Sequence, residues 1–264
     1  MVISILGCGW YGKALGAELI KKGITVNGST TSSEKIGILK AQCIKPYLID
    51  LSPQSKTIDD DFFSCDLLWI SIPPRARAGR GMEYIAQIAE LVGIINKHAI
   101  KHVVLISSTG VYGDNNTTVT ELDEPNPDGE SGKILLEAEN ILRSETDFTT
   151  TIIRFAGLIG PGRDPGRFFA GKTGIQNGDA PVNLIHLTDC VGVSCAIVEK
   201  QAFGNIYNAS APQHPSRAEF YTKAAERSGL EKPAFISEKR SWKIIDSVNV
   251  PTLLQYTYQV NLNE

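Results

Sequence analysis

The sequence lacks an apolar run of the roughly 18–20 residues that a membrane-spanning helix needs, which argues against an α-helical membrane protein. It also lacks blocks of like charge. Its 26 Lys and Arg residues against 29 Asp and Glu residues give a net charge of −3, so neither nucleic acid nor an anionic membrane is expected as a partner. At the N-terminus no basic and apolar leader precedes the first strand, and we expect a cytoplasmic protein.

Cysteine and histidine are scarce and scattered. The five cysteines show no Cys-x-x-Cys spacing, which favours reduced thiols over a disulfide framework. The four histidines show no ligand spacing, so no metal site is expected. The sequence also has no nucleophile elbow of the Gly-x-Ser-x-Gly type and no P-loop. These absences leave few common catalytic chemistries open.

Short apolar runs alternate with helical patterns along most of the 264 residues. This alternation predicts an α/β fold with a Rossmann-like, doubly wound parallel sheet of six or seven strands. The predicted strands are Val2–Leu6, Ile24–Ser29, Ile44–Ile49, Asp66–Ile72, His102–Ser107, Thr150–Phe155, Val182–His186 and Asn205–Asn208. The predicted helices are Tyr11–Lys22, Ser33–Lys40 (capped by Ser32 or Ser33), Met82–His98, Lys133–Leu142, Thr188–Glu199 (capped by Thr188 or Asp189) and Ser216–Ser228.

The pattern changes after Phe155, where residues 157–178 are rich in Gly, Pro and Arg. We therefore predict a nucleotide-binding core made of residues 1–156 plus about 183–212. Residues of about 157–182 and 213–264 would form a small, discontinuous substrate-binding lobe.

The segment between the first strand and the first helix matches Gly-x-Gly-x-x-Gly. Gly7 permits a tight turn, Gly9 lets a pyrophosphate approach the backbone, and Gly12 allows close packing of helix and strand. Unpaired N–H groups at the helix N-terminus then favour an anion. The motif predicts binding of an NAD(P) dinucleotide, with Tyr11 contributing to the loop. Trp10 either covers the pyrophosphate or packs on a neighbouring loop.

The end of the second strand bears on the choice between NAD and NADP. An NAD site usually has a carboxylate here that binds the ribose hydroxyls. This chain has Ser29, Thr30 and Thr31 instead, and no carboxylate appears until Glu34. Lys35 follows as a cation for a 2′-phosphate, so NADP is favoured over NAD.

The stretch Ser107-Ser108-Thr109-Gly110-Val111-Tyr112-Gly113 ends a predicted buried strand. It resembles the active-site strand of the extended short-chain dehydrogenase/reductase superfamily, the NAD-dependent epimerase/dehydratase family. Residues 154–163 and 183–189 resemble later segments of the same family. The resemblance implies that Ser108 polarises a substrate carbonyl and that Lys133 fixes the nicotinamide ribose. The tyrosine of the family's Tyr-x-x-x-Lys pair is replaced by Gly129.

The resemblance also implies further cofactor contacts. The pair Asp50-Leu51 would clamp the adenine, and Ile72 and Pro73 would line the ribose and pyrophosphate. Ser107, next to the carbonyl-polarising position, would also face the cofactor.

The missing tyrosine leaves the proton donor open. Another tyrosine could substitute, with Tyr112 nearest in sequence and Tyr84 and Tyr11 further away. The proton could instead come from Ser131, Glu130, substrate or water, or no dehydrogenase chemistry occurs.

Three arginines, Arg75, Arg163 and Arg167, stand in loops and could bind an anionic substrate group. Arg75, which follows the fourth strand, could instead bind a cofactor phosphate. We therefore predict an NAD(P)-dependent oxidoreductase or epimerase/dehydratase-like enzyme that acts on a small, anionic or sugar-like substrate. The alternative is a non-catalytic NAD(P)-binding protein, such as a redox sensor or a partner-binding module. A dehydratase that uses other acids is a third reading. The resemblance also allows a homodimer, because related enzymes often pair through the helices that correspond to Met82–His98 and Lys133–Leu142.

Overall fold

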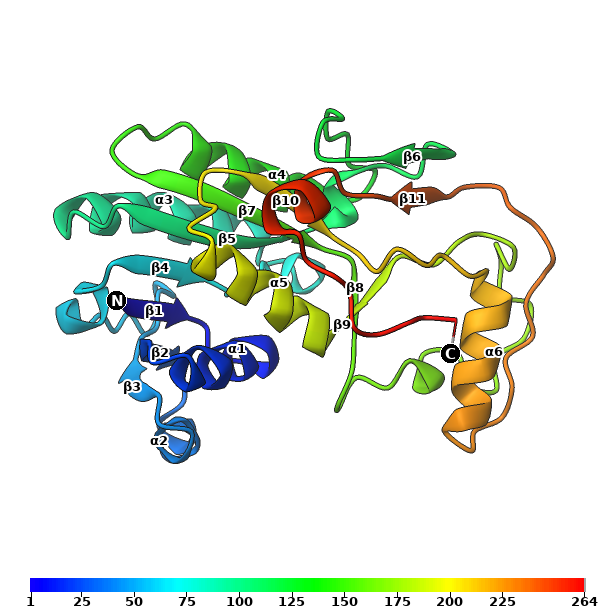
Figure 1. Cartoon of the computed structure of the whole chain (residues 1–264), viewed down its shortest axis with the longest axis horizontal. Helices are drawn as coiled ribbons and strands as arrows, with labels where there is room; N and C mark the ends of the chain where they lie inside the picture. The colour runs from blue at the N-terminus through cyan, green and yellow to red at the C-terminus, as the bar shows by residue number, and fades with distance from the viewer. Residues whose placement is uncertain (264) are drawn as a thin grey trace.

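The protein, described by a computed structural model over residues 1–263 (for Arg77 the backbone alone), is built on a seven-stranded parallel sheet (Figure 1). The strand order is β10-β7-β5-β4-β1-β2-β3. The chain moves outward from β1 in one direction and then from β4 in the other, which places a topological switch point between β1 and β4. The strands of this sheet are β1 (Val2–Leu6), β2 (Thr25–Thr30), β3 (Lys45–Leu48), β4 (Leu67–Ile70), β5 (His102–Ser108), β7 (Thr149–Phe155) and β10 (Ile206–Ala209).

Helices cover both faces of the sheet, which completes the predicted Rossmann-like α/β fold (Figure 1). The helices α1 and α5 pack against each other on one face, and α3 and α4 pack against each other on the opposite face. Their bounds are α1 (Trp10–Lys21), α2 (Ile36–Ala41, against β3), α3 (Gly81–Lys97), α4 (Glu130–Arg143) and α5 (Leu187–Glu199). Strands such as β4, buried at every residue, are what a sheet covered on both faces requires.

A smaller lobe lies beyond the carboxyl ends of the strands, at the right of Figure 1. It contains α6 (Arg217–Arg227) and the parallel pair β8 (Gly157–Ile159) and β9 (Leu184–His186). A second pair, β6 (Thr117–Val119) and β11 (Lys243–Ile245), joins the segment after β5 to the C-terminal tail. The lobe has its own small apolar core, formed by Ile159, Val182, Leu184, Ala211, Phe220 and Leu262.

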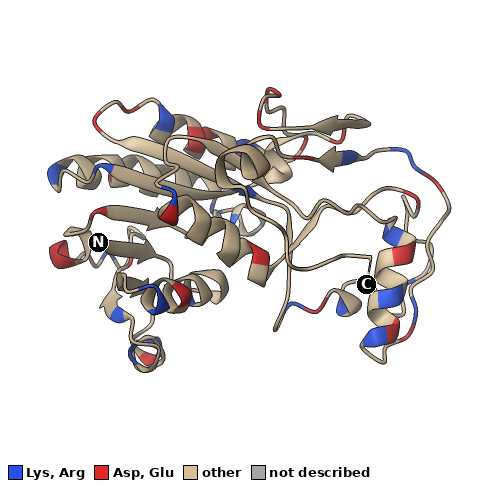
Figure 2. Cartoon of the chain, viewed as in Figure 1, with Lys and Arg blue, Asp and Glu red and all other residues tan. Residues whose placement is uncertain are grey.

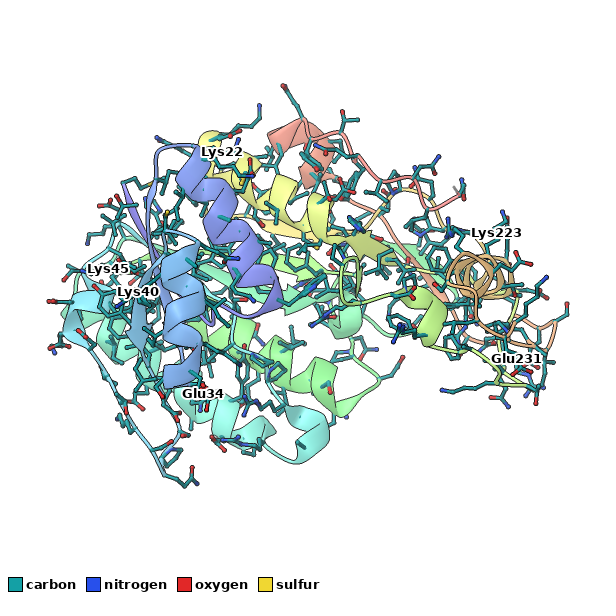
Figure 3. All side chains as sticks on the ribbon, turned by 90° about the horizontal axis from the view of Figure 1, so that it is seen from below. Lys22, Glu34, Lys40, Lys45, Lys223 and Glu231 are labelled. Carbon is teal, nitrogen blue, oxygen red and sulfur yellow. The ribbon has the colours of Figure 1, made fainter. Side chains whose placement is uncertain are left out.

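Charged side chains are distributed over both parts of the molecule (Figure 2). Seen from below, Lys223 and Glu231 mark the end of the lobe, while Lys40 and Lys45 lie at the opposite end, near α2 and β3 (Figure 3). No helix in the described part of the chain combines the length and the apolarity needed to cross a membrane.

The predicted elements of the central sheet and its helices are present, with ends that differ by up to three residues. The three-residue strands β6, β8 and β11 were not predicted, because each depends on pairing with a distant segment. Short 3-10 turns also occur at Ser33–Lys35, Asp60–Phe63, Ala76–Ala78, Thr109–Val111 and Pro165–Arg167, and a π-turn at Val250–Leu254.

The predicted cap of α5 is wrong. His186 occupies the cap position, and its Nδ1 accepts a hydrogen bond from the Thr188 N–H at 3.2 Å. Asp189 is instead fully buried and binds the returning tail: its carboxylate accepts from the Tyr256 hydroxyl at 2.8 Å and from the Gln259 N–H at 2.7 Å. This acid therefore holds the C-terminal segment against the core.

Candidate functional site

The glycine turn has the geometry that its sequence predicts. Gly7 has φ +98°, and a Cβ at this position would lie 2.9 Å from the Ser71 carbonyl carbon at the end of β4. A Cβ at Gly12 would lie 2.7 Å from the Gly7 carbonyl oxygen. The helix α1 begins at Trp10, and no side chain caps its N-terminus. Its first N–H groups are therefore available to an anion.

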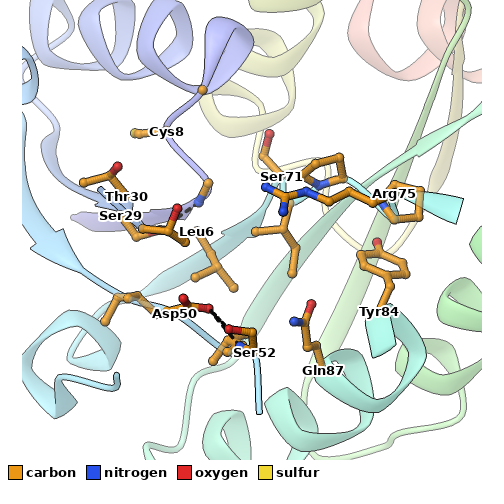
Figure 4. Close-up of a pocket in the computed structure, with 18 of the residues that line it drawn as sticks. Leu6, Cys8, Ser29, Thr30, Asp50, Ser52, Ser71, Arg75, Tyr84 and Gln87 are labelled. Atoms are coloured by element: carbon orange, nitrogen blue, oxygen red, sulfur yellow. Dashed lines mark hydrogen bonds between the residues drawn. The ribbon is translucent and has the colours of Figure 1, made fainter. Parts of the chain in front are cut away.

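A cavity of about 300 Å³ opens beside this turn, at the carboxyl ends of β1, β2 and β4 (Figure 4). Ligands bind at this location in open α/β sheets, next to the switch point. The cavity brings together most of the residues predicted to bind the cofactor: Gly7, Gly9, Ser29, Thr30, Thr31, Asp50, Leu51, Ile72 and Pro73. Lys35, predicted as a cation for a 2′-phosphate, also lines the cavity, as do Arg75, Arg80, Glu83, Tyr84 and Gln87.

Hydrogen bonds within the cavity wall hold several of these groups. The Ser29 hydroxyl accepts from the Gly7 N–H at 2.8 Å, so this side chain supports the turn. Asp50 accepts from the Ser52 N–H at 2.9 Å and also binds the hydroxyls of Ser52 and Ser55. Burial acts to raise the pKa of Asp50, but these hydrogen bonds outweigh it and lower that pKa. Asp50 is therefore a fixed carboxylate at the rim where an adenine clamp is expected.

The end of β2 presents hydroxyls and a cation to the cavity. Thr30, Thr31 and Lys35 line it there, and the only acidic residues among the described lining are Asp50 and Glu83. Glu83 is already paired with Arg80, whose Nε donates to it at 2.8 Å. In the folded protein, as the sequence predicted, no carboxylate among the described residues lines the cavity at the end of β2.

Trp10 and Tyr11 turn their side chains away from the cavity. The Trp10 indole N–H donates to the Pro161 carbonyl at 2.6 Å, and the Arg163 guanidinium lies 4.5 Å from the centre of its ring. Of the two predicted roles, Trp10 thus packs on the neighbouring loop. Tyr11 is buried between α1 and α5, with its hydroxyl 2.6 Å from the Ser194 hydroxyl. Any contact of Tyr11 with a phosphate is limited to its backbone.

The two serines at the tip of β5 differ in their surroundings. Ser107 is buried and donates to the Glu139 carboxylate at 2.5 Å, so its hydroxyl is committed to the interior. Ser108 is half-buried, and its hydroxyl accepts from the Gly110 N–H at 3.1 Å. That leaves the Ser108 proton free to be donated, as a carbonyl-polarising group requires.

Tyr112, the tyrosine predicted as a substitute proton donor, lies in a buried network. Its hydroxyl accepts from Arg154 at 2.6 Å and lies 3.0 Å from both the Thr120 carbonyl and the Asn208 side-chain oxygen. Burial raises the pKa of this phenol, with Arg154 opposing the effect. The hydroxyl proton and the hydroxyl oxygen of Tyr112 are therefore both used in hydrogen bonds within the protein. This arrangement suits a structural role better than the donation of a proton to a substrate.

The segment that carries Lys133 does not form a Tyr-Lys pair. Lys133 is exposed in the first turn of α4, and its ammonium has no partner among the described residues. Gly129 is the cap residue of α4, and a Cβ there would meet nothing within 4 Å. The helix instead contacts the turn Thr109–Val111 after β5 through Gly132, whose Cβ would lie 2.2 Å from the Gly110 carbonyl oxygen.

A second cavity of about 320 Å³ begins at Thr109 and Gly110, immediately after Ser108, and extends into the lobe. Its basic residues are Arg217 and Lys243, and Lys243 also pairs with Asp114 at 2.8 Å and donates to the Tyr112 carbonyl at 2.6 Å. None of the three arginines predicted to bind substrate lines this cavity. Arg75 lines the first cavity, Arg163 stacks on Trp10, and Arg167 is 80% exposed.

Arg217 and Lys243 were not predicted to contribute to a site. Arg217 is the first residue of α6, and Lys243 lies in β11, 135 residues after Ser108, the last residue of β5. Neither belongs to a local motif, so only the folded chain brings them to the cavity.

No family model matches the chain. Protein YeeZ of Escherichia coli (strain K12) is 39% identical over 263 residues, covering 97% of this chain and 95% of that protein. Among solved structures, MoeE5 in complex with UDP-glucose and NAD is similar with a TM-score of 0.80 and 19% identity, over 100% of this chain and 95% of that one. UDP-glucuronic acid 4-epimerase from Bacillus cereus, in complex with NAD, has a TM-score of 0.79 and 20% identity, with the same two coverages.

The sequence motifs, the seven-stranded sheet and these structural similarities agree with one another. The chain has the fold of these NAD-bound structures, and it belongs to the same family as Protein YeeZ.

Proposed function

We propose that this protein binds NADP(H) in preference to NAD(H) in the first cavity and acts as an oxidoreductase or epimerase-like enzyme. The observation that carries the proposal is the cavity beside the glycine turn, with the uncapped N-terminus of α1 on one side and fixed Asp50 on another. Its lining and its position at the switch point support the binding of a dinucleotide there. The similar structures that contain NAD support the same assignment.

The preference for NADP rests on the end of β2. A 2′-phosphate there would meet the hydroxyls of Thr30 and Thr31 and the ammonium of Lys35, with no carboxylate to repel it. A ribose with free hydroxyls would lack the carboxylate partner typical of NAD sites.

The second cavity is the proposed substrate site. It adjoins Ser108, which would donate a hydrogen bond to the substrate oxygen, and its Arg217 and Lys243 would hold an anionic group. A bound nicotinamide cofactor would supply or accept the hydride. The similar structures include complexes with UDP-glucose and UDP-glucuronic acid, which supports a sugar-like or anionic substrate.

Titration calorimetry with NADPH, NADH and their oxidised forms tests the cofactor assignment. We expect NADPH to bind more tightly than NADH, with a preference that weakens as salt increases. Absence of binding by all four would refute the proposal. A preference for NADH that does not change with salt would refute only the NADP assignment.

Turnover is tested by following nicotinamide absorbance with a panel of small anionic and sugar-like carbonyl compounds. We expect activity in the wild type and a loss of about 100-fold or more in Ser108→Ala, the size seen on removing an oxyanion donor. Activity unchanged in Ser108→Ala would contradict this site assignment.

A non-catalytic NAD(P)-binding protein is the second candidate. The observations that favour it are Gly129 at the position expected for tyrosine and the exposure of Lys133, which has no partner among the described residues. Tight cofactor binding without turnover of any compound in the panel would favour this candidate over the enzyme.

A further inference from the structure

The loop after β4 carries an arginine, Arg75, that forms no ion pair among the described residues and interacts with Glu83 only at longer range. Arg75 follows Pro73 and Pro74 and lines the first cavity. Of the other cations in the lining, Arg80 is paired with Glu83, and Lys35 lies at the end of β2. Figure 4 shows the Arg75 guanidinium reaching from one rim toward Ser71, across the cavity from Thr30.

The backbone at Arg75 is unusual. Its φ of +46° and ψ of +30° are left-handed, a conformation that few side chains other than Gly, Asn and Asp adopt readily. Its carbonyl accepts from the Ala78 N–H at 2.9 Å, which closes the 3-10 turn Ala76–Ala78. Six other described non-glycine residues have a positive φ, so the backbone by itself assigns no role to the guanidinium, but it makes glycine the replacement that preserves the loop.

The cavity wall also carries a buried polar group without a partner. Tyr84 is 2% exposed, and its hydroxyl has no hydrogen-bond partner among the described residues. Figure 4 shows Tyr84 and Arg75 on the same side of the cavity. Buried polar groups in folded proteins almost always have partners. A polar ligand or a water molecule in the cavity would supply one.

The glycine turn determines which part of a dinucleotide would lie there. Gly7 is in contact with the end of β4 at Ser71, four residues before Arg75, and it leads into the uncapped N-terminus of α1. The diphosphate belongs at this turn, while the adenosine ribose belongs at the end of β2. In a bound NADP, Arg75 would thus lie near the diphosphate, and Lys35 would lie near the 2′-phosphate.

We infer that Arg75 binds the cofactor diphosphate from the side opposite the α1 N-terminus, so that the loop after β4 acts as a cationic clamp on the dinucleotide. This inference rests on the proposed function, since it concerns the same cavity. It assigns Arg75 to the cofactor rather than to the substrate. Lys35 in contrast would contribute only to the recognition of a 2′-phosphate.

The test compares ADP with adenosine, because the two ligands differ only in the diphosphate. In Arg75→Gly, glycine accepts the left-handed backbone, so the variant removes the guanidinium without imposing strain. We expect ADP, NADH and NADPH each to bind at least about tenfold more weakly, as for the loss of a charge-assisted hydrogen bond. The dissociation constant of adenosine should differ by less than twofold between the variant and the wild type. The salt dependence of ADP binding should become shallower in the variant.

Three control variants isolate the effect. Gln201→Gly makes the same replacement at another left-handed residue, φ +51°, outside the cavity, and should bind ADP as the wild type does. Arg143→Ala removes an exposed arginine from α4 and should also have no effect. Lys35→Ala should weaken the binding of NADPH and leave the binding of NADH unchanged.

The outcomes separate the two proposals. If wild type binds NADPH and ADP but Arg75→Gly binds ADP equally well, the clamp is refuted and the proposed function stands. If Arg75→Gly weakens adenosine as much as ADP, the arginine supports the cavity's shape and the clamp is likewise refuted. If wild type binds no dinucleotide, both proposals fail.

Discussion

Arg154 and Glu139 form an ion pair in the interior, with the Arg154 Nη2 2.6 Å from a Glu139 carboxylate oxygen and side-chain exposures of 1% and 0%. The same carboxylate accepts from Ser107 at the tip of β5. Breaking one partner of such a pair leaves an uncompensated buried charge. We predict that Glu139→Gln or Arg154→Met lowers the free energy of unfolding by about 3–5 kcal/mol.

Urea denaturation checks this prediction, and the double variant Glu139→Leu with Arg154→Met serves as its control. Because the double variant leaves no lone charge, it should be more stable than either single variant. Additive losses in the double variant would show that the pair does not act as a unit.

The start of α4 offers a matched pair of glycines. A Cβ at Gly129 meets open space, whereas one at Gly132 would collide with the Gly110 carbonyl oxygen at 2.2 Å. We predict that Gly129→Ser, which adds a capping hydroxyl, keeps or slightly raises the melting temperature. Gly132→Ser should cost about 1–3 kcal/mol by overpacking. Equal stability of the two variants would contradict the close contact of α4 with the turn.

The cysteines should differ sharply in reactivity. Cys43 is exposed, whereas burial raises the pKa of Cys8 and of Cys195 to about 12 and also raises those of Cys65 and Cys190. Because the thiolate is the reactive form, a disulfide reagent at pH 8 should modify one thiol rapidly in the native protein. The rapid phase should vanish in Cys43→Ser. A rapid thiol that remains in this variant would show that half-buried Cys65 or one of the buried cysteines is accessible to the reagent.

Alkaline pH should destabilise the fold through Tyr207. Burial raises the pKa of this phenol to about 12, from an ordinary value near 10, and its hydroxyl donates to the Ala202 carbonyl at 2.6 Å. Stability from this group is complete below pH 10 and falls as the pH rises toward 12, because the unfolded chain loses the proton first.

The variant Tyr207→Phe makes this contribution measurable. It should be less stable than wild type by about 1 kcal/mol at pH 8, through loss of the hydrogen bond. The difference in the free energy of unfolding between the two proteins should narrow at pH 11. At that pH the unfolded wild type loses the Tyr207 proton, which lowers its stability, whereas the variant has no phenol at this position. A constant difference between the two pH values would refute the assignment to Tyr207.

Asp189 should control the order of the C-terminal segment. Its carboxylate accepts from the Gln259 and Val260 N–H groups and from the Tyr256 hydroxyl. We predict that Asp189→Ala exposes the tail to proteolysis and raises hydrogen exchange after Asp246, because those buried donors lose their acceptor. Protection equal to wild type would contradict this role.

The sheet and the glycine turn could be predicted because their signals are local. Gly7, Gly9 and Gly12 lie within six residues, and the alternation of strands and helices needs no knowledge of distant contacts. The hydroxyl-rich end of β2 was readable for the same reason.

The rest of the site depends on pairing between distant segments. Lys243 reaches the second cavity because β11 pairs with β6, two strands of three residues each that carry no periodic signal. Residues 154 and 139 meet in the core, although each belongs to a different element and looks like an ordinary charged residue in sequence. The placement of Arg75 depends on a left-handed backbone that its residue type does not suggest.

The bond between Trp10 and the Pro161 carbonyl ties the first residue of α1 to the loop that leads into the lobe. Indole fluorescence depends on the surroundings of the ring, so loss of this contact would change the emission of Trp10. The other two tryptophans lie elsewhere, Trp69 in the sheet interior and Trp242 beside the second cavity. A variant in which Trp10 is the single tryptophan therefore carries a fluorophore at the contact between α1 and Pro161. Its emission can follow a separation of these two segments without an added label.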